Sequence, residues 1–166
     1  MTPSKQELLG MLSNNDVTFY IPPYQRNYEW DNEQCEVFLE DIMKTARANL
    51  NGLVTEHFFG TVTYFQSEQV FGQPAKLILI DGQQRITTTM LFFIALRDII
   101  TDESLKKYID QKFLKNDNAG GDAEYKIKLK QVETDWEAYK KIVLGLPLTN
   151  EDKTAAVYHN YKFFLR

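Results

Sequence analysis

The stretch LILIDGQQRITTTMLFF, residues 77–93, constrains the fold more than any other part of the sequence. Four apolar residues lead directly into Asp-Gly-Gln-Gln-Arg, and a second apolar run containing three threonines follows. A short apolar run of this kind is typical of a buried strand, and the longer one of a buried helix. The stretch therefore predicts a strand over 76–80 and a helix over 82–100, with the polar residues at the turn between them.

The residues at this turn favour an anion-binding site. A strand that passes into a helix gathers backbone N–H groups and the positive end of the helix dipole. Gly82 has no Cβ, so a ligand or another backbone segment can come close. Arg85 in the first helical turn opposes the dipole and indicates an anionic partner, such as phosphate or carboxylate. Asp81 is a candidate for binding Mg²⁺ or accepting a proton, and Gln83 or Gln84 for orienting an attacking water.

A purely structural interpretation of the same turn stays open. Asp81 before the helix and Gln84 three residues later match a capping box, which needs no ligand. Arg85 would then pair with Asp81 or with another nearby acid. No P-loop pattern is present in the sequence, and the spacing alone favours this structural interpretation.

The second constellation is IPPYQRNYEW, residues 21–30, which follows a predicted strand over 17–21. The paired prolines break regular structure, because they fix φ and remove hydrogen-bond donors. Tyr24, Gln25 and Arg26 are suited to stacking on a nucleobase and binding phosphate. Taken alone, the stretch is better explained as a buried aromatic cluster with a surface arginine.

The rest of the chain predicts alternating helices and strands. A capping box formed by Asp31 and Gln34 begins a helix that ends near residue 50, and TDWE at 134–137 is a second capping box. The last apolar period is unbroken at Arg166, so we expect this chain to be the N-terminal piece of a longer protein. The remaining predicted elements are a helix over 5–13, strands over 57–65 and 125–129, a loop over 115–123, a helix ending at about 144 and a last helix beginning near Thr149.

Composition excludes several classes of protein. The 166 residues are 43% hydrophobic, so the chain buries a core, and a single cysteine excludes a disulfide framework. The net charge of −4 argues against broad binding to a nucleic-acid backbone, and we read the lysine-rich stretch 106–130 as solvated surface. The two histidines, His57 and His159, lack the spacing of a zinc site. The sequence shows neither a signal peptide nor an apolar run long enough to span a membrane, so we predict a soluble, cytoplasmic protein.

Three stretches in this order resemble the N-terminal domain of GmrSD-type modification-dependent restriction proteins: IPPYQRNYEW, FFGTVTYF and LILIDGQQRITTTMLFFIAL. YKIKLKQVETDWEAYKKIV and VYHNYKFFL resemble later segments of that family, so the resemblance covers most of the chain. It implies an α/β (α+β) fold with a small mixed sheet and flanking helices. A ParB/sulfiredoxin-like, nucleotide-binding core would occupy residues 1–114, and a mainly helical C-terminal portion would begin over 115–166.

The resemblance also implies a function. The domain would bind and hydrolyse a nucleoside triphosphate with Mg²⁺, and thereby regulate or power DNA restriction in defence against phage or other foreign DNA. A partner nuclease would cleave the DNA, since this chain has no His-Asn-His-type motif. Two alternatives remain: a non-catalytic nucleotide- or DNA-sensing module that controls a partner nuclease, and a structural interaction domain. The implied catalytic residues are Asp81, Gln83, Gln84 and Arg85, with Asp81 also the Mg²⁺ ligand, and the implied nucleotide-binding residues are Tyr24, Gln25, Arg26, Gly82, Thr87 and Thr88.

Overall fold

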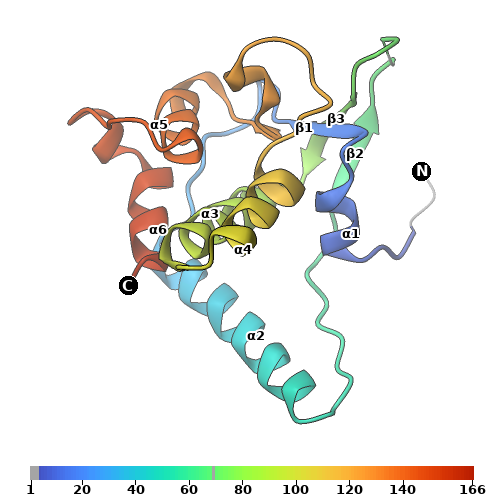
Figure 1. The fold of residues 1–166 in the computed structure, drawn as a ribbon, viewed down its shortest axis with the longest axis vertical. Coiled ribbons are helices and arrows are strands. Elements are labelled where there is room, and N and C mark those ends of the chain that lie inside the picture. The colour runs from blue at the N-terminus through green and yellow to red at the C-terminus, as the bar shows by residue number, and fades with distance from the viewer. Residues whose placement is uncertain (1–3, 69) are drawn as a thin grey trace.

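The computed structural model describes residues 4–68 and 70–166 (Figure 1). Within these ranges the chain combines helices with one small sheet, as the sequence predicts. In chain order the elements are α1 (Leu8–Ser13), β1 (Val17–Tyr20), α2 (Asn32–Leu50), β2 (Thr63–Gln66), β3 (Ala75–Asp81), α3 (Gln83–Ile99), α4 (Glu103–Ile109), the π-helical turn η1 (Asp110–Leu114), the 3-10 turn η2 (Ala123–Lys126), β4 (Leu129–Lys130), α5 (Glu133–Leu144), the 3-10 turn η3 (Asp152–Thr154) and α6 (Ala156–Phe164).

The sheet is mixed, with the strand order β2-β3-β1-β4 in the described residues. The central strand β1 runs parallel to both β3 and β4, whereas β2 pairs with β3 in the antiparallel direction. A register shift between Thr63 and Tyr64 marks a bulge where β2 meets the end of β3. The predicted α+β class is therefore confirmed. Because β4 follows residue 114, the two predicted portions of the chain contribute to the same sheet.

Helix α3 lies at the centre of the molecule and packs against α6, α4 and η1 (Figure 1). Ile86, Met90, Leu91 and Ile94 are fully buried, and so are most other residues of the helix. A helix that is apolar on all sides must be covered on all sides, which explains the long apolar run in the sequence. The N-terminus of α3 begins directly after β3, so the sheet and the helix meet at the Asp-Gly turn.

Helix α2 confirms the prediction from its capping box. The Asp31 carboxylate accepts from the N–H of Glu33, and the Gln34 side chain accepts from the N–H of Asp31. The helix ends at Leu50, before Gly52 with φ +78°. Its C-terminal half, with the segment that follows, extends away from the other helices (Figure 1). Its N-terminal half is anchored by Phe38, whose ring lies 5.9–6.3 Å from the rings of Phe59, Phe92 and Phe164 in edge-to-face contacts.

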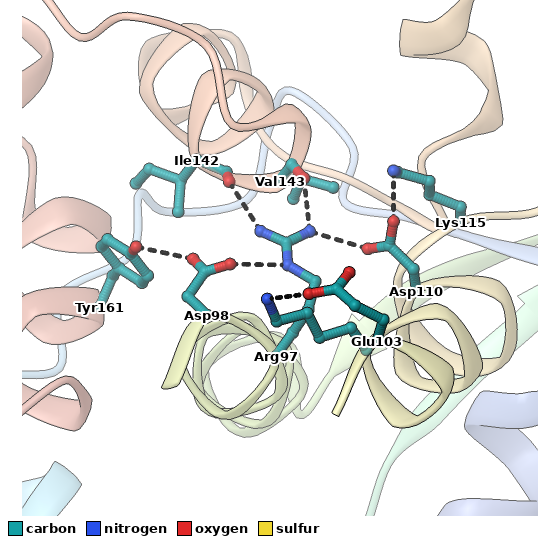
Figure 2. A network of polar contacts seen from close by, with 9 residues as sticks. Arg97, Asp98, Glu103, Asp110, Lys115, Ile142, Val143 and Tyr161 are labelled. Carbon is teal, nitrogen blue, oxygen red and sulfur yellow. Dashed lines mark hydrogen bonds and ion pairs between the residues drawn. The ribbon is translucent and has the colours of Figure 1, made fainter. Parts of the chain in front are cut away.

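A buried arginine joins the C-terminal end of α3 to α5 (Figure 2). Arg97 donates from Nε to Asp98 and from Nη1 to Asp110, both at 2.8 Å. It also donates to the carbonyl oxygens of Val143 at 2.7 Å and Ile142 at 3.4 Å, which belong to the last turn of α5. Burial alone lowers the pKa of Arg97, but the two carboxylates outweigh that effect and raise it. The network is a structural clamp between the core helix and the C-terminal helices.

The prediction of a strand over 57–65 is wrong for its first six residues, since β2 begins at Thr63. Gly60 has φ +106°, a conformation that an extended strand does not contain. The carbonyl of Thr61 accepts a hydrogen bond from Arg85 and not from a neighbouring strand. The alternation of apolar residues in this segment therefore arises from contacts other than sheet pairing.

The prediction of a strand over 125–129 is also wrong for most of its residues. Residues 123–126 form η2, and only Leu129 and Lys130 pair with β1. Lys128 was expected on the solvent side, yet it is fully buried and its ammonium donates to three oxygens, those of Leu12, Asn15 and Lys112. Pairing with those oxygens overrides the alternating pattern.

Two predicted helix starts are wrong as well. Helix α5 begins at Glu133 after Val132, which has no capping side chain, because the Thr134 hydroxyl donates instead to Asn27 in a distant loop. The last helix begins at Ala156 and not near Thr149. Asp152 accepts from the N–H and the hydroxyl of Thr149, and these hydrogen bonds hold a turn that leads into η3 before the helix begins.

Candidate functional site at the junction of β3 and α3

Gly82 is the residue that precedes α3 and has φ +90°, which favours glycine. A Cβ at this position would lie 3.0 Å from a side-chain carbon of Val62 and 3.2 Å from the carbonyl oxygen of Thr61. Of the two reasons for glycine that the sequence leaves open, close approach of another backbone segment is therefore the one observed. The segment before β2 consequently lies directly beside the turn.

The first turn of α3 has no side-chain cap, so the capping-box interpretation of Asp81 and Gln84 is wrong. The Gln84 side chain points to the 27–30 segment instead. Its oxygen accepts from the N–H groups of Glu29 at 2.9 Å and Trp30 at 3.3 Å, and its nitrogen donates to the carbonyl of Asn27 at 2.9 Å. The N–H groups that begin a helix without a side-chain cap form a favourable environment for an anion.

Arg85 lies against the segment before β2. One terminal nitrogen donates to the carbonyl of Thr61 at 2.7 Å, and it lies 4.0 Å from the Asp81 carboxylate. The guanidinium also lies over Gly60, where a Cβ would be 2.9 Å from it. Its Nε–H is buried and has no hydrogen-bond partner, the only such side-chain atom found in the described residues. A buried donor without a partner is costly, so this side chain is not fully satisfied within the protein.

The structure brings the IPPYQRNYEW stretch to the same junction. The Gln25 side chain donates to the carbonyl of Ile80 at 3.1 Å and accepts from the Gln83 side chain at 3.2 Å. Tyr24 is 75% exposed, and Arg26 lies at the surface, 3.3 Å from the carboxylate of Glu29. Residues from two distant parts of the sequence thus lie together, with an aromatic ring and a second guanidinium at the solvent edge.

Thr87 and Thr88 lie beneath this surface and are buried. The Thr88 hydroxyl donates to the carbonyl of Gln84 at 2.9 Å and forms a 2.7 Å hydrogen bond with the hydroxyl of Tyr28. The Thr87 hydroxyl accepts from the side chain of Gln131 at 2.9 Å. Both threonines therefore support the turn from inside the fold, and neither hydroxyl is exposed to solvent.

Asp81 ends β3 with its side chain 63% exposed. Among the residues that the structure describes, no group of three or more His, Cys, Asp and Glu side chains is arranged to hold a metal ion. Mg²⁺ in nucleotide sites is usually held by one or two carboxylates together with phosphate oxygens and waters. The donor set at Asp81 fits a Mg²⁺ ion that arrives with phosphates, and it does not fit a site built from protein ligands alone.

At the junction the Asp81 side chain is exposed and that of Arg85 is partly exposed, whereas Gly82, Gln83 and Gln84 are buried. Two hollows, of about 420 Å³ and 220 Å³, lie elsewhere: the larger between α1 and the strands β2 and β3, the smaller beside Asn15 and Gly72. Neither is lined by a residue of 81–88. A ligand at the junction would therefore lie on a surface formed by Asp81, Arg85 and the 24–26 segment.

Sequence reasoning missed two contributors to this site. Gly60 and Thr61 hold the guanidinium of Arg85, although nothing marks them as partners of a residue 24 positions away. An isolated glycine inside an apolar strand pattern often signals a close backbone approach, and Gly60 in FFGTV is such a glycine.

The fold and the junction define an α+β domain in which a helix N-terminus without a side-chain cap lies beside Arg85 and the exposed carboxylate of Asp81. Residues 7–164 match the family of the GmrSD restriction endonuclease N-terminal domain, and the chain belongs to that family. Membership associates the chain with a restriction system, with DNA and with a partner nuclease domain. No curated protein sequence matches the chain significantly. Within the described ranges, no helix is both long enough and apolar enough to cross a membrane.

Proposed function

We propose that the β3–α3 junction binds the phosphates of a nucleoside triphosphate and that the domain hydrolyses it to regulate DNA restriction. The observation that carries the proposal is the buried, unpartnered Nε–H of Arg85 beside the uncapped N-terminus of α3. Both features favour the same chemical group, a phosphate, which would reach the buried Nε–H once the segment that carries Gly60 and Thr61 moves aside.

Each residue of the junction has a role in this proposal. Arg85 binds a phosphate oxygen and neutralises the charge that develops during transfer, and Arg26 contributes from the opposite edge. Tyr24 offers a ring on which a nucleobase can stack. Gln25 and Gln83, joined side chain to side chain, fix the distance between the two halves of the site. Asp81 would hold Mg²⁺, which when bound supplies further neutralisation of phosphate charge.

One observation favours the alternative of a nucleotide-sensing module without turnover. Gln83 and Gln84 are the candidates for orienting an attacking water, and both side chains already have protein partners. Gln84, Thr87 and Thr88 are buried in this arrangement and support the site from inside. Hydrolysis then requires Gln83 to release Gln25 when the nucleotide binds.

Two measurements test the proposal and separate the alternatives. Thermal unfolding is followed with ATP, GTP, CTP or UTP in the presence of Mg²⁺, where a ligand at 100 times its Kd adds about 2.7 kcal/mol of stability. Release of inorganic phosphate is measured for wild type, Arg85→Ala and the control Arg47→Ala, which removes an exposed arginine at the end of α2. Loss of the Arg85 charge should slow hydrolysis by about 10³-fold, while Arg47→Ala should have no effect.

The outcomes are distinct. Stabilisation with phosphate release that depends on Arg85 supports the hydrolase. Stabilisation without phosphate release supports the sensing module. Failure of all four nucleotides to stabilise the wild type leaves a structural interaction domain, and it contradicts the proposal.

A further inference from the structure

The 24–30 loop, which carries Tyr24, Gln25 and Arg26, has no regular secondary structure. Buried backbone N–H and C=O groups outside helices and sheets need other partners. Here they are provided by side chains from α3, α5 and α6. Gln84 of α3 forms hydrogen bonds with the backbone of Asn27, Glu29 and Trp30. The Asp135 carboxylate of α5 accepts from the N–H of Tyr28 at 2.7 Å. The Asn160 side chain of α6 donates to the carbonyl of Trp30 at 2.6 Å.

Asn160 of α6 is 1% exposed. Its side-chain nitrogen donates to the carbonyl of Trp30 at 2.6 Å and to the hydroxyl of Tyr28 at 3.0 Å. An amide nitrogen carries two protons, and this geometry uses both. Neither a leucine nor an ionised aspartate of the same size provides these donors, so the position depends on an asparagine.

These contacts continue to the junction as a directed series of hydrogen bonds. The Thr88 hydroxyl has a single proton, which it donates to the carbonyl of Gln84. The hydroxyl of Tyr28 must therefore donate to Thr88, and it can accept the proton of Asn160. The series runs from Asn160 of α6 to the backbone of Gln84, and its first two steps join residues 132 and 60 positions apart in the sequence.

The loop is thus held between two amides. Gln84 binds one side of it from α3, and Asn160 binds the other side from α6. Asp135 of α5 provides a third contact, and burial raises the pKa of its carboxyl. The position of the loop relative to the N-terminus of α3 is therefore set by the C-terminal helices.

We infer that Asn160 is a positioning residue for the candidate site: it fixes the 24–30 loop so that Gln25 and Arg26 face the nucleotide bound at the start of α3. This inference rests on the proposed function and adds to it a dependence on the last helix of the chain. Asn160 does not touch the nucleotide. It acts through Tyr28 and Trp30.

The test compares Asn160→Leu with Val157→Ala. Both positions are buried in α6, but Val157 makes core contacts only and does not bond the loop. Amide hydrogen exchange of residues 24–30 is measured in both variants, together with the Kd for the nucleotide that stabilises the wild type. Asn160→Ser, a smaller change that keeps one donor, serves if Asn160→Leu does not fold.

We expect exchange in the 24–30 loop to become about tenfold faster in Asn160→Leu than in Val157→Ala, and the nucleotide Kd to rise about tenfold. Equal exchange in the two variants would overturn the inference, since Asn160 would then not hold the loop. Faster exchange with an unchanged Kd would also overturn it, because the loop position would not matter for binding. If no nucleotide binds the wild type, the proposed function fails, while the exchange data still decide whether Asn160 positions the loop.

Discussion

The two ends of α3 each carry an arginine, and the two differ in how completely the protein satisfies them. Arg97 at the C-terminal end donates to two carboxylates and two carbonyls (Figure 2). Arg85 at the N-terminal end has one hydrogen bond to a carbonyl, a carboxylate at 4.0 Å and a buried Nε–H without a partner. The guanidinium of Arg97 therefore has a full set of protein partners, whereas that of Arg85 does not.

This difference in hydrogen bonding indicates a different role for each arginine. A buried charge that is fully paired and hydrogen-bonded holds the structure together, and its removal leaves several partners unsatisfied. A guanidinium with unused donors beside an uncapped helix terminus has capacity left for an anion from outside. Arg97 is accordingly a clamp for α5, and Arg85 is the candidate ligand-binding residue.

Arg97→Met should have the largest effect on stability and tests the difference between the two arginines. It leaves Asp98, Asp110 and the carbonyls at the end of α5 without their shared donor, so we expect a loss of about 3–5 kcal/mol in the free energy of unfolding. Arg85→Met should cost about 1 kcal/mol, since it gives up one hydrogen bond to a carbonyl. Urea denaturation measures both. Equal losses would mean that Arg85 is as structural as Arg97.

Lys128 extends the comparison to a buried cation whose three hydrogen-bond acceptors are all neutral oxygens. Burial, with a smaller effect of Lys112, lowers its pKa from 10.5 to about 8. Between about pH 8 and 10 the native state has lost this proton while the unfolded state keeps it, so stability rises with pH.

The measurement is the free energy of unfolding of wild type and Lys128→Met across this pH range. As the pH rises, the free energy of unfolding of the wild type should increase relative to that of the variant by up to about 1.4 kcal/mol per pH unit. Groups other than Lys128 titrate in both proteins and cancel in the difference. A constant difference from pH 8 to pH 10 would show that the ammonium is not strained by burial.

Gly60→Ala tests how the protein holds Arg85. Alanine at φ +106° is strained, and its Cβ would also lie 2.9 Å from the guanidinium. Gly72→Ala is the matched control, because Gly72 has φ +76° with nothing within 4 Å of the added atom. Both should lose about 1 kcal/mol from backbone strain, and Gly60→Ala about 1 kcal/mol more. Equal losses in thermal unfolding would mean that Arg85 moves aside freely.

Much of the fold could be predicted because local signals and tertiary packing agree. The capping box at Asp31 and the apolar period after it define α2, and the apolar runs on either side of Gly82 define β3 and α3. Tyr24 to Arg26 were also expected beside this turn, and Gln25 does contact both Ile80 and Gln83. These predictions depend on residues close in sequence or on one shared family pattern.

The predictions fail where hydrogen bonds to residues far away in the sequence determine the local structure. Thr134 looks like a helix cap, but its hydroxyl bonds to Asn27, 107 positions away, and α5 begins without it. Gln84 looks like part of a capping box, but it holds the 24–30 loop. Lys128 looks exposed by alternation, yet oxygens from α1 and η1 bury it. No pattern within a few residues specifies such contacts.

The measurement that tests the account most directly is calorimetric titration of wild type, Arg85→Met and Arg47→Met with the nucleoside triphosphates and Mg²⁺. We expect at least one nucleotide to bind the wild type, with a Kd about tenfold or more weaker for Arg85→Met and unchanged for Arg47→Met. Equal affinities in wild type and Arg85→Met, or no binding of any nucleotide to the wild type, would contradict the assignment of the incomplete end of α3 to a phosphate.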